Sequence, residues 1–178
     1  MFLRLAFLRP MLAAALIGTI GLAGVALPLP GVARADQIIR IGQGWQTYIN
    51  SRFGMRFDYP SDVFQALQPP QNGDGQSFAT TDASLQIFAT HNTLDETPGS
   101  MKRDMVGMEA YEHVTYSPSG RTWLVLSGYR GDRIFYEKYF FNDGVIFAFA
   151  LEFPTERKPY YAPIIERIED SFRAGRSD

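Results

Sequence analysis

The strongest constraint on the fold lies in residues 121–153, where three apolar segments are joined by two short turn signals. The segments cover 121–129, 133–141 and 145–153, and the joints between them are Gly131-Asp132 and Asp143-Gly144. Such dipeptides are typical of two-residue β-hairpin loops, because these loops need a left-handed backbone. The sequence therefore predicts an antiparallel meander with a fixed register. Its expected cross-strand neighbours are Tyr136 with Ser127 and Leu151, and Lys138 with Val125 and Phe149.

Both faces of this meander are apolar, whereas an antiparallel sheet with one face in water shows polar residues at every second position. We therefore expect a covering layer on each face. A C-terminal helix supplies the first layer, with Pro163 in its first turn and an apolar stripe at helical spacing. The stripe consists of Tyr161, Ile164, Ile165, Ile168 and Phe172.

The second layer is expected to contain a helix that starts at Thr97-Pro98 and ends near Ala110. Met101, Met105 and Met108 repeat at helical spacing along it and indicate a packed face rather than a metal site. The irregular N-terminal segments are assigned to the same face. They comprise a short polar lead, extended segments over 45–49 and 55–59, and a helical turn over 61–67. A hairpin over 76–80 and 84–90 follows them and belongs to the sheet.

These elements predict an α+β fold, an antiparallel sheet of about six strands with helices on both faces. The strand expected over 112–116 completes the sheet. Hydrophobic residues make up 46% of the chain, so it has the apolar material for one ordinary core. We expect a single globular domain over residues 36–178.

Residues 1–35 have the pattern of a signal peptide. Two arginines precede an apolar run over 11–27, and Ala33-Arg34-Ala35 forms a small-residue cleavage site before Asp36. An uncleaved membrane anchor is the alternative. The chain has no cysteine, which excludes an acylated lipoprotein and any disulfide. We expect a periplasmic or secreted protein, with no stable membrane span after cleavage.

The charge balance excludes a nucleic-acid partner. Without residues 1–35 the chain carries 14 basic and 19 acidic residues, and it has three lysines in all. Binding to a nucleic-acid phosphate backbone requires clustered Lys and Arg side chains, which this balance of charges does not provide. The expected partner is an unknown protein or another envelope component.

Few residues are suited to catalysis or metal binding. Asn72, Asp74 and Asp82 could supply oxygen ligands, but the positions between and after them do not follow the spacing of a calcium loop. His91 and His113 are the only histidines, and no nucleophile motif surrounds Ser127. We expect neither a cofactor nor a metal, and we expect that the protein is not an enzyme.

Two surfaces are candidates for binding. The first is an exposed aromatic patch around Trp45, Tyr48 and Phe64, with Tyr160 nearby. The second is the meander face that carries Ser127, Tyr136 and Lys138. There Lys138 extends its amine to an edge, pairs with Glu137 or Glu152, or joins the other two in a pocket for an anion or a peptide carboxylate.

Several segments resemble a group of small exported bacterial proteins of unassigned function. They are Tyr48-Ile49-Asn50, Arg52-Phe53-Gly54, Phe57-Asp58-Tyr59-Pro60, Asn72-Gly73-Asp74-Gly75 and the stretch from Ser127 to Lys138. More remotely, two parts of the chain are similar to the PsbP, DcrB and Mog-type α/β sandwich. The first is the motif aromatic-Gly-x-x-Phe-x-Tyr-Pro near the start of the domain, and the second is the last strand with its Phe-Pro and the helix that ends in Ser171-Phe172. That resemblance implies non-catalytic proteins that dock on other proteins, and it implies no catalytic residues.

The sequence thus predicts an exported, non-catalytic binding or accessory protein of the bacterial envelope. The alternative is a small-ligand-binding or hydrolytic protein that uses the face of Ser127, Tyr136 and Lys138.

Overall fold

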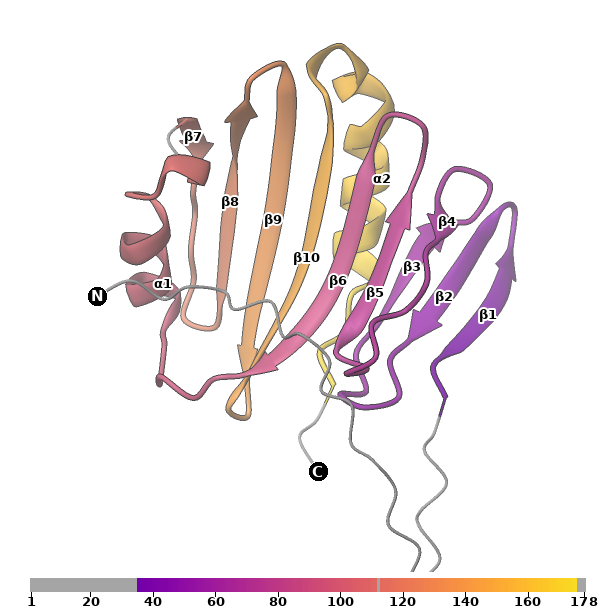
Figure 1. Ribbon diagram of the computed structural model, residues 1–178, viewed down its shortest axis with the longest axis horizontal. Coiled ribbons are helices and arrows are strands. Elements are labelled where there is room, and N and C mark those ends of the chain that lie inside the picture. Colours follow the sequence, from indigo (N-terminus) through magenta and orange to yellow (C-terminus); the bar gives the residue numbers. More distant parts are fainter. Residues whose placement is uncertain (1–34, 112, 176–178) are drawn as a thin grey trace, which may run out of the picture. The chain divides into compact units, whose positions relative to one another are not determined.

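The computed structural model describes residues 35–111 and 113–175. The expected signal peptide lies, except for Ala35, outside the described residues. In chain order the elements are β1 (Gln37–Gly42), β2 (Trp45–Ile49), β3 (Arg56–Pro60), β4 (Gln65–Ala66), β5 (Gly75–Ala79), β6 (Ser84–His91), α1 (Pro98–Met105), η1 (Glu109–Tyr111), β7 (His113–Tyr116), β8 (Trp123–Arg130), β9 (Arg133–Asn142), β10 (Val145–Pro154), η2 (Thr155–Arg157) and α2 (Lys158–Ser171). Figure 1 shows their arrangement.

A seven-stranded antiparallel sheet forms the centre of the fold, in the order β4-β5-β6-β10-β9-β8-β7. Its meander has the predicted register: Tyr136 lies opposite Ser127 and Leu151, and Lys138 lies opposite Val125 and Phe149. The loop between β9 and β10 consists of Asp143 and Gly144, and both have a positive φ, as a tight hairpin loop requires. The predicted α+β class is confirmed, with one strand more in this sheet than the approximate six.

A second, three-stranded sheet of order β1-β2-β3 lies against the first. Its inward residues Tyr48, Phe57 and Tyr59 enter the same buried core as the stripe of α2, so the expectation that the N-terminal segments cover the opposite face is wrong. The physical reason is the alternation along β2 and β3, which turns large aromatic rings toward Phe78. The expected polar lead is in fact strand β1, and the expected turn over 61–67 ends in the short strand β4.

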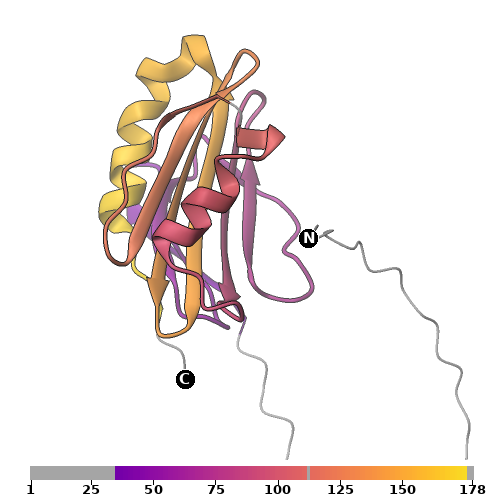
Figure 2. The same cartoon turned by 90° about the vertical axis from the view of Figure 1, so that its left-hand side faces the viewer.

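A smaller core lies on the other face of the seven-stranded sheet, beneath α1 and η1. Met101 and Met105 pack against Leu124, Leu126 and Phe135 there. Met108 is 52% exposed because the helix ends at Met105, five residues before the expected end. Figure 2 shows α1 and α2 on opposite sides of the sheet, so helices on both faces are confirmed.

The C-terminal helix α2 begins earlier than expected. Its N-terminal proline is Pro159, while Pro163 lies inside the helix rather than in the first turn. The predicted stripe is otherwise confirmed, since Tyr161, Ile164 and Ile168 are buried. No helix within the described residues is long and apolar enough to cross a lipid bilayer.

The chain that follows α2 closes the outer edge of β3. The Asp58 N–H donates to Ser171 Oγ at 2.9 Å, and Arg56 and Arg173 exchange two backbone hydrogen bonds. Gly175 lies so close to the backbone of Phe53 that a Cβ at this position would stand 1.6 Å from the Phe53 carbonyl oxygen. The last described residues are therefore an integral part of the N-terminal sheet.

Candidate functional site

One face of the large sheet is hollowed beside α2, and we call this hollow the α2 cleft. It has a volume of about 440 Å³ and lies between α2 and strands β7, β8 and β9. The helix contributes Lys158, Ala162, Glu166 and Glu169, whose spacing of three or four residues places them on one flank. The neighbouring flank is the apolar stripe, so packing of that stripe on the sheet also orients the wall of the cleft.

The sheet contributes three tyrosines and a serine. Ser127 and Tyr129 lie two residues apart on β8, so their side chains point to the same face of the sheet, and Tyr136 comes from β9. Tyr116 comes from the edge strand β7, where one extra residue interrupts the register between Val114 and Tyr116. Such a bulge redirects the side chains next to it, and here both residues after Val114 line the cleft.

Glu169 is the centre of the polar contacts within the cleft. Its Oε1 accepts a hydrogen bond from the Tyr136 hydroxyl at 2.6 Å and another from Lys138 Nζ at 2.7 Å. The Lys138 and Glu169 side chains are 20% and 24% exposed, so the ion pair is largely shielded. Burial raises the pKa of Tyr136, and the bond to Glu169 raises it further. Tyr136 therefore remains a protonated donor at neutral pH.

This arrangement decides between the alternatives for Lys138. The side chain pairs with neither Glu137 nor Glu152, and its amine lies over the rings of Trp123 and Phe140 at 5.7 and 5.3 Å. Its charge is instead compensated by Glu169 on α2. A free cation for an anion site is therefore lacking at this position, although Ser127 and Tyr136 do line the cleft.

The mouth of the cleft, in contrast, carries uncommitted side chains. Tyr116 is 55% and Tyr129 is 39% exposed, and Lys158 and Glu166 are exposed as well. Within the described residues none of these four has a hydrogen-bond or ion-pair partner. The cleft thus offers two phenol groups, a cation at the start of α2 and a carboxylate two turns further along.

The predicted aromatic patch does not form. Tyr48 and Phe64 are each 1% exposed and belong to the core, because β2 turns Tyr48 inward and the chain after β3 places Phe64 against Tyr161, 6.2 Å between ring centroids. Trp45 is half-buried, and the Arg167 guanidinium lies 3.8 Å from its ring. Only Tyr160 of the expected group is exposed, at 45%.

A larger and shallower hollow of about 730 Å³ lies beside the β1–β2 hairpin. Trp45 and Phe64 line it, together with Arg40 and Asp62. Phe64 offers almost no surface there, and the walls of the hollow come from the hairpin tip and the chain between β3 and β4. We take the α2 cleft as the candidate site because two of its walls are the long strands β8 and β9 and a third is helix α2.

The candidate metal loop is also explained by local contacts. The Asn72 amide donates to Asp74 Oδ2 at 2.5 Å, while Asp82 accepts from Tyr161 at 2.7 Å and from Thr80 at 2.8 Å. These bonds lower the pKa of Asp82. In the described part of the chain no three acidic, histidine or cysteine side chains are grouped to hold a metal ion.

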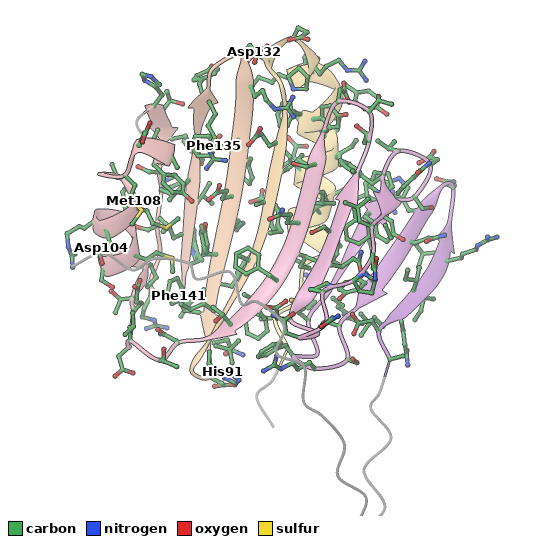
Figure 3. All side chains as sticks on the ribbon, viewed as in Figure 1. His91, Asp104, Met108, Asp132, Phe135 and Phe141 are labelled. Carbon is green, nitrogen blue, oxygen red and sulfur yellow. The ribbon has the colours of Figure 1, made fainter. Side chains whose placement is uncertain are left out.

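The two histidines lie on different strands. His91 ends β6, where its ring contacts Phe53 at 5.3 Å, and His113 begins β7. Figure 3 shows His91 at the opposite end of the sheet from Asp132. Both histidines are exposed, and the Ser127 hydroxyl donates to the Phe135 carbonyl at 2.8 Å rather than to an imidazole.

A second polar cluster is buried on the opposite face of the sheet, beneath η1. Glu137 is 6% exposed, and its carboxylate accepts hydrogen bonds from Arg130 at 2.9 Å, Tyr111 at 2.8 Å and Tyr139 at 2.7 Å. The Arg130 guanidinium also lies 4.2 Å from the Phe135 ring centroid. Arg130 also pairs with Glu152 at 3.2 Å and donates to the Ala110 carbonyl at 3.0 Å, so these contacts hold η1 on the sheet, and we assign the cluster no binding role.

Comparison with known proteins supports the fold. No family model and no curated protein matches the chain. Among solved structures it is similar to the solution structure of cyanobacterial PsbP (CyanoP) from Synechocystis sp. PCC 6803, with 15% sequence identity and a TM-score of 0.55 over 75% of this chain and 95% of that one. A protein from Bacteroides thetaiotaomicron VPI-5482 is 12% identical, with a TM-score of 0.48 over 72% of this chain and 47% of that one. The remote likeness to PsbP predicted from the sequence is confirmed at the level of the fold.

Proposed function

We propose that the protein is an exported, non-catalytic binding or accessory protein of the bacterial envelope, and that it recognises a partner protein through the α2 cleft. The observation that carries the proposal is the mouth of the cleft. The side chains of Tyr116, Tyr129, Lys158 and Glu166 surround a hollow of about 440 Å³ and have no hydrogen-bond or ion-pair partner within the described residues. Tyrosine is enriched in protein interfaces, because it combines apolar area with a hydrogen-bonding group.

Charge complementarity adds specificity to this surface. Lys158 and Glu166 lie eight residues apart on α2, roughly 12 Å along the helix axis at the usual rise per residue. A partner segment with an acidic group near one end and a basic group near the other matches both. The inner pair of Lys138 and Glu169 is already neutralised, so it supplies a rigid wall instead of a competing charge.

Rigid support also favours binding over chemistry. The polar groups inside the cleft are engaged with the protein itself: Ser127 with a backbone carbonyl, and Tyr136 with Glu169. A site held by strands and a helix keeps its shape before a partner arrives, which lowers the entropic cost of binding.

The volume of the cleft favours one alternative, a small ligand. Sites for small molecules commonly occupy about 300–1,000 Å³. In that case Ser127, Tyr136 and Glu169 line the site, and a bound molecule is expected to accompany the purified protein.

Site-specific photocrosslinking in the native cell envelope tests the proposal. A photoreactive phenylalanine analogue at Tyr116 or Tyr129 is expected to give the same discrete protein adduct, while the analogue at the exposed Tyr160, outside the cleft, gives none. Glu166→Lys is expected to abolish the adduct. Equal labelling from all three positions refutes the proposed site, and a small molecule found by native mass spectrometry, without any protein adduct, favours the alternative.

Export is tested separately by N-terminal sequencing of the protein purified from the expressing cells. The expected first residue is Asp36, and a chain that begins at Met1 refutes cleavage. The side chain of Asp36 is held in place by Tyr48 at 2.5 Å and by the Ser51 backbone N–H at 2.7 Å.

A further inference from the structure

The inner polar groups of the α2 cleft are hydrogen-bond acceptors. They are the side chains of Ser127, Tyr136 and Glu169, which line the cleft beside one another on β8, β9 and α2. The Ser127 hydroxyl donates its hydrogen to the Phe135 carbonyl at 2.8 Å, and the Tyr136 hydroxyl donates its hydrogen to Glu169 Oε1 at 2.6 Å. Each of these hydroxyl oxygens keeps lone pairs, and an ionised carboxylate only accepts. A group that enters here must therefore bring the donor hydrogens itself.

Glu169 keeps one oxygen free to accept. Tyr136 and Lys138 both donate to its Oε1, whereas Oε2 has no hydrogen-bond partner in the part of the chain that the structure describes. Lys138 is not among the residues that line the cleft, so its amine reaches the carboxylate from the other side and leaves Oε2 to the cleft. Ammonium and guanidinium groups make the strongest hydrogen bonds to such an oxygen, because the bonds are charge-assisted.

The charges at this end of the cleft do not balance. Glu166 lies three residues before Glu169 on α2, is exposed, and has no ion-pair partner among the described residues. The two carboxylates and the Lys138 ammonium together leave one negative charge. Lys158 lies roughly 12 Å from Glu166 along the helix axis, which exceeds the screening length of about 8 Å at physiological ionic strength, so it does not offset that charge.

The remaining surface of the cleft suits the stem of a long cationic side chain. Ile134, Phe153 and Ile165 form an apolar floor, and they are 7%, 1% and 8% exposed. Lysine and arginine pack their methylene groups on such surfaces while the charged end stays in a polar environment. The rings of Tyr116 and Tyr129 at the mouth add attraction for a cation through their negative faces.

The geometry points to a lysine or arginine side chain of the partner protein as the group that enters the α2 cleft. Its charged end lies at Glu169 Oε2 and near Glu166, and its stem lies on the apolar floor. This inference rests on the proposed function, because it names the contact group of the partner at the same site. Without residues 1–35 the chain carries 19 acidic and 14 basic residues, so its overall charge also attracts a basic partner.

Nuclear magnetic resonance with hexylammonium, hexanoate and hexan-1-ol tests the charge of the group that the cleft accepts. The three probes share one apolar stem and differ only in the head group. Amide spectra are recorded on isotope-labelled protein purified from cells that express the full sequence. Hexylammonium is expected to shift the amide signals of Ser127, Tyr136 and Glu169 in a saturable manner. The other two probes are expected to bind there at least about fivefold more weakly, because they lack the charge-assisted bond.

Two variants and a control assign the binding to the carboxylates. Glu169→Gln removes the charge at the proposed contact and is expected to weaken hexylammonium binding about tenfold, and thermal unfolding checks that this variant folds. Glu166→Gln alters an exposed side chain without a partner among the described residues, and an effect of about threefold is expected. Glu109→Gln is the matched control, since Glu109 is exposed at η1 on the opposite face of the sheet, and its variant is expected to bind like the unmodified chain.

Three results would overturn the inference. They are shifts of the same amides by hexanoate or hexan-1-ol as strong as those by hexylammonium, hexylammonium binding that neither Glu166→Gln nor Glu169→Gln weakens, and the lack of any saturable shift in the cleft. The last result counts because the probe carries both the charge and the stem that the site requires. Photocrosslinking at Tyr116 and Tyr129 reports whether a partner is bound, whatever the charge of its contact group. Failure of the cation site and failure of the proposed function are therefore distinguishable.

Discussion

The buried cluster around Glu137 yields the sharpest stability prediction. Removing the cation with Arg130→Met leaves a carboxylate that is 8% exposed without its charged partner. Breaking a buried ion pair by removing one member commonly costs about 3–5 kcal/mol. Two tyrosine hydroxyls still donate to Glu137, and Arg130 is itself 31% exposed, so water reaches the gap. We therefore expect a loss at the lower end, about 3 kcal/mol.

Urea unfolding followed by circular dichroism measures this loss. At a typical slope of about 2 kcal/mol per molar urea, the midpoint falls by roughly 1.5 M. Arg121→Met is the matched control, because Arg121 is exposed and has no hydrogen-bond or ion-pair partner among the described residues. Its expected effect is within about 0.5 kcal/mol.

A double-mutant cycle separates the ion pair from the lost packing of the arginine stem. Glu137→Leu combined with Arg130→Met is expected to cost about 2 kcal/mol less than the sum of the two single changes. Additive losses, or an Arg130→Met variant as stable as the Arg121→Met control, would show that the cluster is solvated and would refute the reasoning.

Three further predictions concern strand β8, the Glu137 cluster and the α2 cleft. Gly128→Ala is expected to destabilise the protein by about 2 kcal/mol or more, since the added Cβ would stand 2.0 Å from a backbone oxygen of β7. Gly107→Ala is the control: a Cβ there meets open space, and the expected loss stays within about 0.5 kcal/mol. Thermal unfolding of the two variants measures the difference. Burial raises the pKa of Tyr111 from 10.0 to about 12, so the unfolded chain loses this proton at a lower pH than the folded protein does. The free energy of unfolding therefore falls as the pH rises from 10 to 12. Tyr111→Phe is expected to flatten that decline in urea titrations at a series of pH values, and an unchanged dependence of stability on pH contradicts the prediction. Lys138→Met is expected to cost about 1 kcal/mol, because Glu169 keeps its bond from Tyr136 and partial access to water, and a loss above about 3 kcal/mol would mean that the pair is fully desolvated.

The meander could be predicted closely because its signals are local. The dipeptides Gly131-Asp132 and Asp143-Gly144 determine loop length, loop length determines register, and the register placed Tyr136 and Lys138 correctly. The same logic separated the two apolar faces, whose side chains enter the two cores observed.

Features that depend on distant packing were missed. β1 is exposed on both faces and has no apolar alternation to mark it, so it read as a polar lead. The sequence near Tyr48 and Phe64 does not show that a second sheet packs there, so both residues were predicted to be exposed, whereas each is 1% exposed.

The contact of Glu169 with the sheet was also missed, although the sequence contains a signal for it. It lies next to Ile168 and one turn after Ile165, at the margin of the apolar stripe. A helical projection therefore places it near the sheet, within reach of the lysine that needed a partner. The bulge that turns Tyr116 into the cleft has no comparable signal in the sequence.

Closure of β3 by the tail after α2 has a consequence for biosynthesis. Ser171 is synthesised 113 residues after Asp58, yet Ser171 and Arg173 complete the free edge of β3. The central pair of β6 and β10 likewise joins segments separated by more than 50 residues. A nascent chain that stops before α2 thus has no finished sheet edge and no finished core, so folding waits until α2 and the residues after it have been synthesised. If the protein is exported as proposed, this delay keeps the chain unfolded for its passage through a translocation channel.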